Sequence, residues 1–348
     1  MNVAPTHPLP KHLLVRPEWL ALRTEAIIEP ELPIIDPHHH LWDHPGNRYL
    51  FPELLADLAQ GHNIRATMFM QCDSMYRQDG DPDMRPVGET EFVNGIAAMS
   101  ASGLYGSTRA CAGIIGYADL RLGDRVKAVL EAHIAAGGGR FRGVRNMAVW
   151  HKDPAAHGST ARPPEGLLLD PSLRRGLSVL TSLGLVFDTF TYHTQMADLC
   201  DLARAAPDAS IVLNHISAPI GIGPYEGKRK DVFADWSKSI AEVARYPNVT
   251  VKLGGMGMKM FGFRFQDEPL PPTSEQLAEA WRPYIEHTIS VFGPNRCMFE
   301  SNFPVDKGTC SYAALWNAFK RIAAQYSADE KTAMFSGTAA RVYRLSVA

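Results

Sequence analysis

Three consecutive histidines, His38, His39 and His40, follow the apolar residues 32–35 after Asp36 and Pro37. Alternate side chains of an extended strand share one face, so His38 and His40 project together while His39 points the other way. Two imidazoles on one face can hold one metal ion. The alternative is a polar loop with a chance run of histidines. The apolar residues before the run and Trp42 behind it favour the functional interpretation.

A second candidate is His215, which closes the apolar segment 211–214. Taken alone, a histidine after a strand is more often a hydrogen-bonded structural residue. Together with the His38 and His40 pattern, it indicates a group that binds a metal ion or polarises a substrate carbonyl.

The residues Asp36-Pro37-His38-His39-His40-Leu41-Trp42 form the pattern D-x-H-x-H-L-W at the end of an apolar strand. This pattern resembles the amidohydrolase superfamily, in particular its branch of lactonase-like TIM-barrel hydrolases related to the sugar-lactone and pyrone-dicarboxylate lactonases. His215 extends the resemblance, because such relatives carry a histidine at the end of strand six. The resemblance covers most of the chain and implies metal-ligand or substrate-binding roles for His38 and His40.

The eighth predicted strand departs from the family pattern. Relatives usually end it on Asp within G-S-D-W-P, whereas this chain has Asn302 at that place. An amide cannot act as a base and is a weak ligand for a transition metal. Glu300 lies two residues earlier and on the same face, so we predict that it acts as ligand or base and that Asn302 only orients substrate or water. Glu300 as a mere buried partner of Lys252 is the alternative, and Asp306 is a more distant candidate.

Arg142 and Arg145 form an R-G-x-R segment that resembles the substrate-binding segment of the family. A guanidinium fork suits a carboxylate or a lactone oxygen. Residues three apart on a strand face opposite sides unless a bulge intervenes at Gly143, so we expect one arginine in the pocket and the other in a surface salt bridge.

Tyr192 and His193 come just after the fifth predicted strand, in a segment where relatives commonly carry an arginine. Either side chain is a candidate for the site, with His193 as a further catalytic residue and Tyr192 as a substrate-binding one. Weaker candidates come from the first long loop: Tyr76, Arg77, Arg85 and Glu89.

Short apolar segments alternate with segments of helical periodicity, which predicts a (β/α)8 TIM barrel. The first strand ends at the histidines, and the others are expected at 65–72, 109–117, 141–147, 184–190, 210–216, 248–253 and 296–299. Helices are expected near 17–22, 54–58, 92–99, 126–134, 172–182, 195–205, 232–245, 275–291, 311–325 and 328–341. An open doubly wound sheet is the alternative fold.

Long polar loops follow the second, fourth, sixth and seventh strands. They cover residues 73–89, 150–170, 217–231 and 256–273. Loops that follow barrel strands gather at the C-terminal face, where such enzymes place their sites. We therefore expect long loops at that face to build the walls of one pocket.

The chain has 348 residues, 45% hydrophobic and 21% charged, which is enough for one barrel domain at 33–348 preceded by an N-terminal extension at 1–32. A formal net charge of −2 gives no reason to expect nucleic-acid or membrane partners. The five cysteines lack a CxxC spacing, which argues against a disulfide framework or a structural zinc site. Without a signal-like or membrane-spanning segment, we expect a cytoplasmic protein.

The resemblance implies a hydrolase that attacks a small, carboxylate-bearing lactone, or a related ester or amide, with activated water. The resemblance implies either one divalent metal ion, zinc or manganese, or a metal-free mechanism, and Asn302 leaves both open. A metal-dependent, non-oxidative decarboxylase of aromatic or unsaturated acids is the second hypothesis, and a barrel that only binds a small ligand is the third. The expected partner is a small-molecule substrate, and a homo-oligomer is compatible with the family although no residue identifies an interface.

Overall fold

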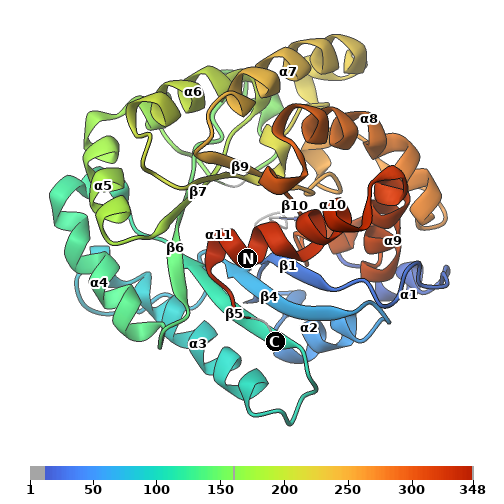
Figure 1. Ribbon diagram of the computed structural model, residues 1–348, viewed down its shortest axis with the longest axis horizontal. Coiled ribbons are helices and arrows are strands. Elements are labelled where there is room, and N and C mark those ends of the chain that lie inside the picture. Colours follow the sequence, from blue (N-terminus) through green and yellow to red (C-terminus); the bar gives the residue numbers. More distant parts are fainter. Residues whose placement is uncertain (1–11, 160, 347–348) are drawn as a thin grey trace, which may run out of the picture.

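Eight parallel strands form one sheet in the order β1-β4-β5-β6-β7-β8-β9-β10, and helices surround it (Figure 1). The computed structural model describes residues 12–159 and 161–346. The strands are β1 (Ile34–His39), β4 (Ile64–Met70), β5 (Arg109–Gly116), β6 (Phe141–Met147), β7 (Val186–Phe190), β8 (Ile211–Leu213), β9 (Val249–Leu253) and β10 (Cys297–Phe299). The predicted TIM barrel is confirmed.

The sheet closes where β1 meets the residues that follow β10. The amide of His40 donates to the carbonyl of Phe303 at 2.7 Å, and the amide of Asn302 donates to the carbonyl of His38 at 2.8 Å. A parallel bridge between His39 and Phe303 completes the seam. The open-sheet alternative is therefore excluded, and the seam runs through the backbone of the histidine segment.

Helices connect successive strands and pack on the outside of the barrel (Figure 1). They are α1 (Pro17–Leu20), α2 (Phe51–Leu58), α3 (Val87–Ala101), α4 (Val126–Ala136), α5 (Pro171–Ser182), α6 (Met196–Ala205), α7 (Arg229–Ala244), α8 (Ser274–Phe292), α9 (Tyr312–Ile322), α10 (Ala328–Thr332) and α11 (Thr338–Tyr343). A π-helical turn, Ala333–Gly337, separates α10 from α11, so the segment expected as one helix has three parts. No helix of the described residues is long and apolar enough to cross a membrane.

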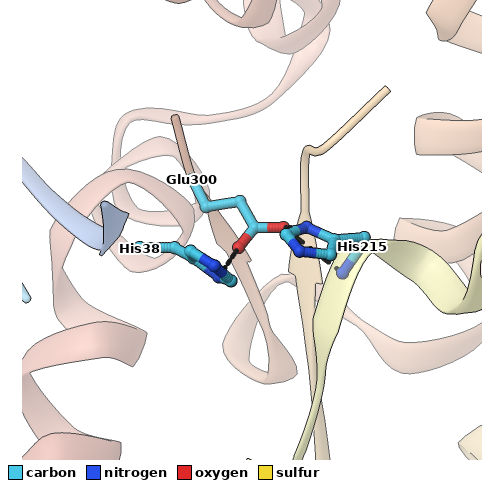
Figure 2. Close-up of side chains that lie close together, drawn as sticks. All are labelled: His38, His215 and Glu300. Carbon is cyan, nitrogen blue, oxygen red and sulfur yellow. Dashed lines mark hydrogen bonds and ion pairs between the residues drawn. The ribbon is translucent and has the colours of Figure 1, made fainter. Parts of the chain in front are cut away.

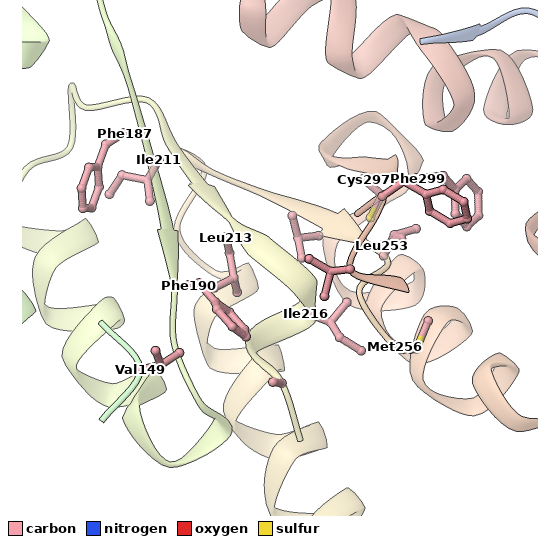
Figure 3. Packing of buried hydrophobic residues seen from close by; sticks show 14 of the residues in the cluster. Val149, Phe187, Phe190, Ile211, Leu213, Ile216, Leu253, Met256, Cys297 and Phe299 are labelled. Atoms are coloured by element: carbon pink, nitrogen blue, oxygen red, sulfur yellow. The ribbon is translucent and has the colours of Figure 1, made fainter. Parts of the chain in front are cut away.

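Apolar side chains pack in two places. The larger cluster lies between strands and helices, and Figure 3 shows part of it, including Phe187, Leu213 and Phe299. A smaller cluster fills the inside of the barrel at the N-terminal ends of its strands, with Met68 and Val212 among its members. Tyr343 of α11 belongs to this inner cluster, so the C-terminal helix closes that end of the barrel.

Two short elements precede α2. The strands β2 (Trp42–His44) and β3 (Asn47–Tyr49) form an antiparallel hairpin that the sequence analysis did not predict. Its turn contains Gly46 at φ 72°, a conformation that glycine adopts without strain. The hairpin places Trp42 directly beside the histidine segment.

The predicted N-terminal extension, residues 1–32, lies partly outside the described residues, as do residues 347–348 of the predicted barrel domain. From residue 12 onward the extension runs along the outside of the barrel. The side-chain oxygen of Asn317 on α9 accepts from the amide of Ile28 at 2.9 Å, and Lys320 donates to the carbonyl of Ile28 at 2.8 Å. These bonds hold the C-terminal part of the extension against α9.

Candidate active site

Side chains from both ends of the sheet meet at the C-terminal face of the barrel. His38 comes from the end of β1, His215 from the turn after β8, and Glu300 from the residue after β10 (Figure 2). His215 and the two residues after it have φ between 49° and 56°. Consecutive non-glycine residues in this left-handed region are strained, and such strain clusters at functional sites.

Glu300 bridges the two histidines. Its Oε1 lies 2.6 Å from Nδ1 of His215, and its Oε2 lies 2.7 Å from Nδ1 of His38. The amide of His215 also donates to Oε1, at 3.3 Å. All three side chains are buried. The arrangement brings together three of the four residues that the sequence analysis proposed as metal ligands.

Two glycines make room for this bridge. A Cβ atom at Gly254 would lie 2.4 Å from Cγ of Glu300, and one at Gly255 would lie 2.3 Å from Nδ1 of His215. Real Cβ atoms do not approach other atoms so closely, so any larger residue here would displace the pair. The Gly-Gly sequence after β9 is a signal for the site that the sequence analysis did not use.

His40, the fourth proposed ligand, lies beside this group. Its Nε2 is 3.3 Å from Nε2 of His38, and its Nδ1 is 2.8 Å from the carbonyl of Met70. A ring nitrogen that faces a carbonyl carries the proton, so Nε2 of His40 is the unprotonated nitrogen of a neutral ring.

Burial controls the charges of these groups. It raises the pKa of Glu300 to about 8, although Lys252 nearby acts in the opposite direction. Burial also lowers the pKa of His38 and of His215 well below the usual value, and the positive charges of Lys252 and Arg145 add to this effect. Both imidazoles are therefore neutral, and each can accept a proton or bind a cation.

Lys252 belongs to a second buried group beneath the histidines. Its Nζ lies 2.9 Å from Asp188 and 3.4 Å from Nδ1 of His38. Tyr343 donates to both carboxylate oxygens of Asp188 at 3.0 Å, and Asn214 donates to one of them at 2.8 Å. The ion-pair partner of Lys252 is thus Asp188, which the sequence analysis missed. Its signal was an acidic residue in the middle of the apolar strand β7.

The two arginines of β6 lie in different surroundings. Arg145 is buried in the site, where it donates to the side chain of Gln71 at 3.1 Å and also to its carbonyl, and its Nη1 lies 3.3 Å from Nε2 of His38. Arg142 is half-buried and donates to the carbonyl of Gly139 at 2.7 Å, in the turn before the strand. The site therefore contains Arg145 and not Arg142.

Three other predicted residues do not join the group. The hydroxyl of Tyr192 accepts from the amide of Gly158 at 3.2 Å, and Nδ1 of His193 accepts from the amide of Ile220 at 3.2 Å. Tyr76 donates to Asp73 at 3.0 Å. None of Tyr192, His193 and Tyr76 lines the large pocket above the site.

Asn302 does line this pocket, and Asp306 fixes its amide. The Nδ2 atom of Asn302 donates to Asp306 at 2.8 Å, and the amide of Gly257 donates to the other oxygen of Asp306 at 2.9 Å. One of the two N–H groups on Nδ2 is thereby engaged, which leaves Oδ1 and one N–H of Asn302 for a ligand. The side chain can orient a ligand by hydrogen bonds but cannot take a proton.

The pocket has a volume of about 1220 Å³, and His40, Arg145 and His215 lie at its floor. Loops after β6, β8 and β9 supply its walls, as the loop lengths predicted, whereas the long loop 73–89 after β4 contributes only Asp73. Its charged lining residues are Arg145, Arg162, Arg229, Lys259 and Arg264, against Asp73, Glu226 and Asp267. Five cations against three anions favour a negatively charged ligand.

The donor types at the site fit a divalent metal ion. One ligand atom each from His38, His215 and Glu300 lies within 4.8 Å of the others. Oε2 of Glu300 is buried and accepts no hydrogen bond, because its contact with His38 lies outside hydrogen-bond geometry. Two imidazoles and a carboxylate are a common ligand set for zinc. Arg145 and Lys252 place positive charge next to His38, which opposes a further cation.

Comparison with known proteins places this geometry in a family. The chain is 34% identical over 337 residues to an uncharacterized protein, y4mH, of Sinorhizobium fredii. The alignment covers 90% of this chain and 99% of the relative. It is 26% identical over 329 residues to an L-fucono-1,5-lactonase of Burkholderia multivorans, with coverage of 89% and 96%.

Solved structures share the fold. A zinc-bound amidohydrolase of Burkholderia multivorans matches with a TM-score of 0.69 and 23% identity, over 90% of this chain and 99% of that one. A 5-carboxyvanillate decarboxylase of Sphingomonas paucimobilis matches with a TM-score of 0.52 and 12% identity, over 90% and 100%. The amidohydrolase family model matches residues 35–345. The chain therefore belongs to the amidohydrolase family and is an enzyme of that superfamily.

Proposed function

We propose that this enzyme hydrolyses a lactone, or a related ester, of a small carboxylate-bearing molecule. The observation that carries the proposal is the pair of Glu300 and His215, whose atoms Oε1 and Nδ1 lie 2.6 Å apart. His215 lines the pocket, whereas Glu300 is fully buried and does not. A substrate in the pocket can therefore contact the histidine, and the carboxylate acts from behind it.

In this pair Glu300 is the positioning residue and His215 the base. The carboxylate accepts the Nδ1 proton, which leaves Nε2 of His215 unprotonated and able to take a proton from water. Glu300 ionises as the pH approaches its pKa of about 8, and its negative charge then stabilises the imidazolium that forms. The hydroxide equivalent attacks the substrate carbonyl, and the ring-opened alcohol regains the proton from His215.

Two pocket residues assist this step. Arg145 supplies guanidinium protons for the negative charge that develops on the carbonyl oxygen, because its bonds to Gln71 leave part of its fork free. Asn302, held by Asp306, accepts a hydrogen bond from the attacking water or from a substrate hydroxyl. The remaining cations of the pocket attract the substrate carboxylate.

A divalent ion is compatible with this site. His38, His215 and Glu300 would hold it, with His40 adjacent. A bound zinc or manganese ion would supply a Lewis acid and lower the pKa of a coordinated water. Elemental analysis of protein purified without added metal tests this part of the proposal. The metal content should be lower in Glu300→Gln than in the wild type.

The test of function is a panel of substrates. We expect acid release from carboxylated lactones, and less from the neutral L-fucono-1,5-lactone, measured with a pH indicator and corrected for spontaneous opening. Release of carbon dioxide from aromatic or unsaturated acids, without turnover of any lactone, would instead establish the decarboxylase hypothesis. Ligands that raise the melting temperature but are never turned over would establish the binding-only barrel.

A further inference from the structure

The N-terminal extension reaches the pocket with residues 12–14, which we call the strap. The ring of His12 stacks on Trp42 with centroids 4.9 Å apart and planes 9° apart. His12, Leu13 and Leu14 all line the pocket. Trp42 also stacks on His40, at 5.7 Å, so only one ring separates the strap from the floor of the site.

Contacts of the strap itself and of the residues just after it hold it against the barrel. Arg16 donates to the carbonyl of Gln266 at 2.6 Å, and Trp19 donates to the carbonyl of Glu268 at 3.1 Å. Both carbonyls belong to the long loop after β9, which supplies part of the pocket wall. Leu13 packs on Gly308, where an added Cβ would lie 2.5 Å from Cβ of Leu13. The strap is therefore a packed part of the wall.

This part of the wall is apolar and partly open to water. Leu14 is 54% exposed although it lines the pocket, and Ile222, Met258 and Val305 line the same pocket. An exposed leucine at a pocket mouth gains stability when an apolar group covers it. The volume of about 1220 Å³ exceeds the usual range for small-molecule sites, roughly 300–1000 Å³, so it leaves room beyond a single lactone ring.

We propose that the strap forms an outer subsite that binds an apolar substituent, an alkyl chain or an aryl group, carried by the substrate. The inference deepens the proposed function, because it names the substrate as an amphipathic acid derivative: its reacting carbonyl lies near His215 and its apolar part lies against Leu13 and Leu14. His12 to Leu14 are then specificity-determining residues contributed from outside the barrel.

Binding of unbranched carboxylates from butyrate to octanoate, measured by calorimetry, tests the subsite without turnover. Each methylene that reaches the subsite should tighten the dissociation constant by up to about fourfold in the wild type. Leu14→Ala should weaken octanoate several-fold and leave butyrate unchanged. Leu22→Ala is the matched control, because Leu22 is an equally exposed leucine of the extension, at 58%, that does not line the pocket.

A second variant displaces the strap without changing its residues. Gly308→Ala forces Leu13 away, and it should weaken octanoate as Leu14→Ala does. Gly95→Ala is its control, because a Cβ at that position meets nothing within 4 Å. Both Gly308→Ala and the leucine variants should keep the wild-type melting profile, which is recorded for each.

The two proposals fail in different ways. If no lactone or ester is hydrolysed but the carboxylate series still depends on Leu14, the proposed function is wrong and the subsite stands. If lactones are hydrolysed but chain length leaves the dissociation constant unchanged, or if Leu22→Ala and Leu14→Ala have equal effects, the subsite is wrong. For alkyl-substituted lactones, Leu14→Ala should raise KM and keep kcat.

Discussion

The two ends of the barrel interior are equally buried but differ in what they do. The N-terminal end holds Met68, Val212 and Met298, apolar side chains whose burial stabilises the fold. The C-terminal end holds His38 and Glu300, whose burial shifts their pKa values away from the usual range. The N-terminal end thus stabilises the fold, whereas burial of the reactive groups at the C-terminal end lowers stability.

Between these ends lies the ion pair of Lys252 and Asp188. On the apolar side, Asp188 accepts a hydrogen bond from Tyr343. On the side of the site, Nζ of Lys252 lies next to Nδ1 of His38. Substitutions on either side of this pair should therefore separate effects on activity from effects on stability. The following experiments use that separation.

The largest effect is expected from Glu300→Gln, which keeps the shape of the side chain and removes its charge. We expect kcat/KM to fall by about 10²–10⁴, as is typical for loss of a general base system. At pH 8 and above, where Glu300 is ionised, the melting temperature should stay level or rise because a buried charge is gone. Asn302→Ala, which removes an acceptor that cannot take a proton, should cost less. Near-normal turnover of folded Glu300→Gln would show that the carboxylate is dispensable.

Lys252→Met tests the boundary between the two ends. It leaves the carboxylate of Asp188 buried without its cation, and breaking a buried pair in this way costs about 3–5 kcal/mol of unfolding free energy. Chemical denaturation measures the loss. The double variant with Asp188→Asn should recover part of it, because both charges are then absent. A double variant that is no more stable than the single one would contradict the pairing.

Met68→Ala tests the apolar end. The surroundings of Met68 are tightly filled, since a Cβ at the neighbouring Gly113 would lie 2.3 Å from the sulfur of Met68. Deleting a buried methionine side chain should lower the unfolding free energy by about 2–5 kcal/mol and leave kcat per folded molecule unchanged. Met99→Ala, on an exposed part of α3, provides the control and should change stability by less than about 0.5 kcal/mol.

The smallest effect is expected from Glu89→Gln, which tests how the unfolding free energy depends on pH. Glu89 is buried behind the loop after β4, where its Oε1 accepts from the amides of Cys72 at 3.0 Å and Ser74 at 2.8 Å. Burial raises its pKa to about 8 from an ordinary value of 4.5. The folded protein therefore holds a proton that the unfolded chain releases, so this contribution is full below pH 4.5 and is lost as the pH rises towards 8.

The amide of Gln cannot titrate, so the Glu89→Gln variant should not lose this part of its unfolding free energy as the pH rises. Relative to the wild type, it should gain at least about 1.4 kcal/mol between pH 5 and pH 8 in denaturation curves, the value of one pKa unit. Glu131→Gln, on the exposed face of α4, serves as the control. Parallel curves for wild type and Glu89→Gln would contradict the raised pKa.

The sequence predicted the fold well because each strand is a short apolar segment bounded by polar residues. Residues 141–147 were expected as a strand and form β6 with the same bounds. The hairpin at Trp42 was missed because its strands, Trp42–His44 and Asn47–Tyr49, are mostly polar and contain no apolar run. The π-helical turn at Ala333 was missed because helical periodicity does not distinguish it from a continuous helix.

The site was predicted in part, for a physical reason. His38 lies at the end of a strand, and His215 and Glu300 follow strands. The C-terminal ends of strands converge at one face in any barrel. The choice between Arg142 and Arg145 depends on the direction of each side chain, which alternation alone does not give. Asp188 acquires its role only from partners far along the chain, 155 residues away in the case of Tyr343. No local pattern carries such information.

The seam between β1 and the residues after β10 has a consequence for synthesis on the ribosome. The hydroxyl of Ser301 donates to the carbonyl of His38 across 263 residues of sequence. At a translation rate of about 5–20 residues per second, the histidine segment waits roughly 15–50 s for the strand that holds it in place. During that interval Asp36 and His38 lack their seam partners Ser301 and Asn302, and a nascent chain that ends before Glu300 has neither a closed barrel nor the carboxylate that positions His215. Activity should therefore appear in a single late step of translation.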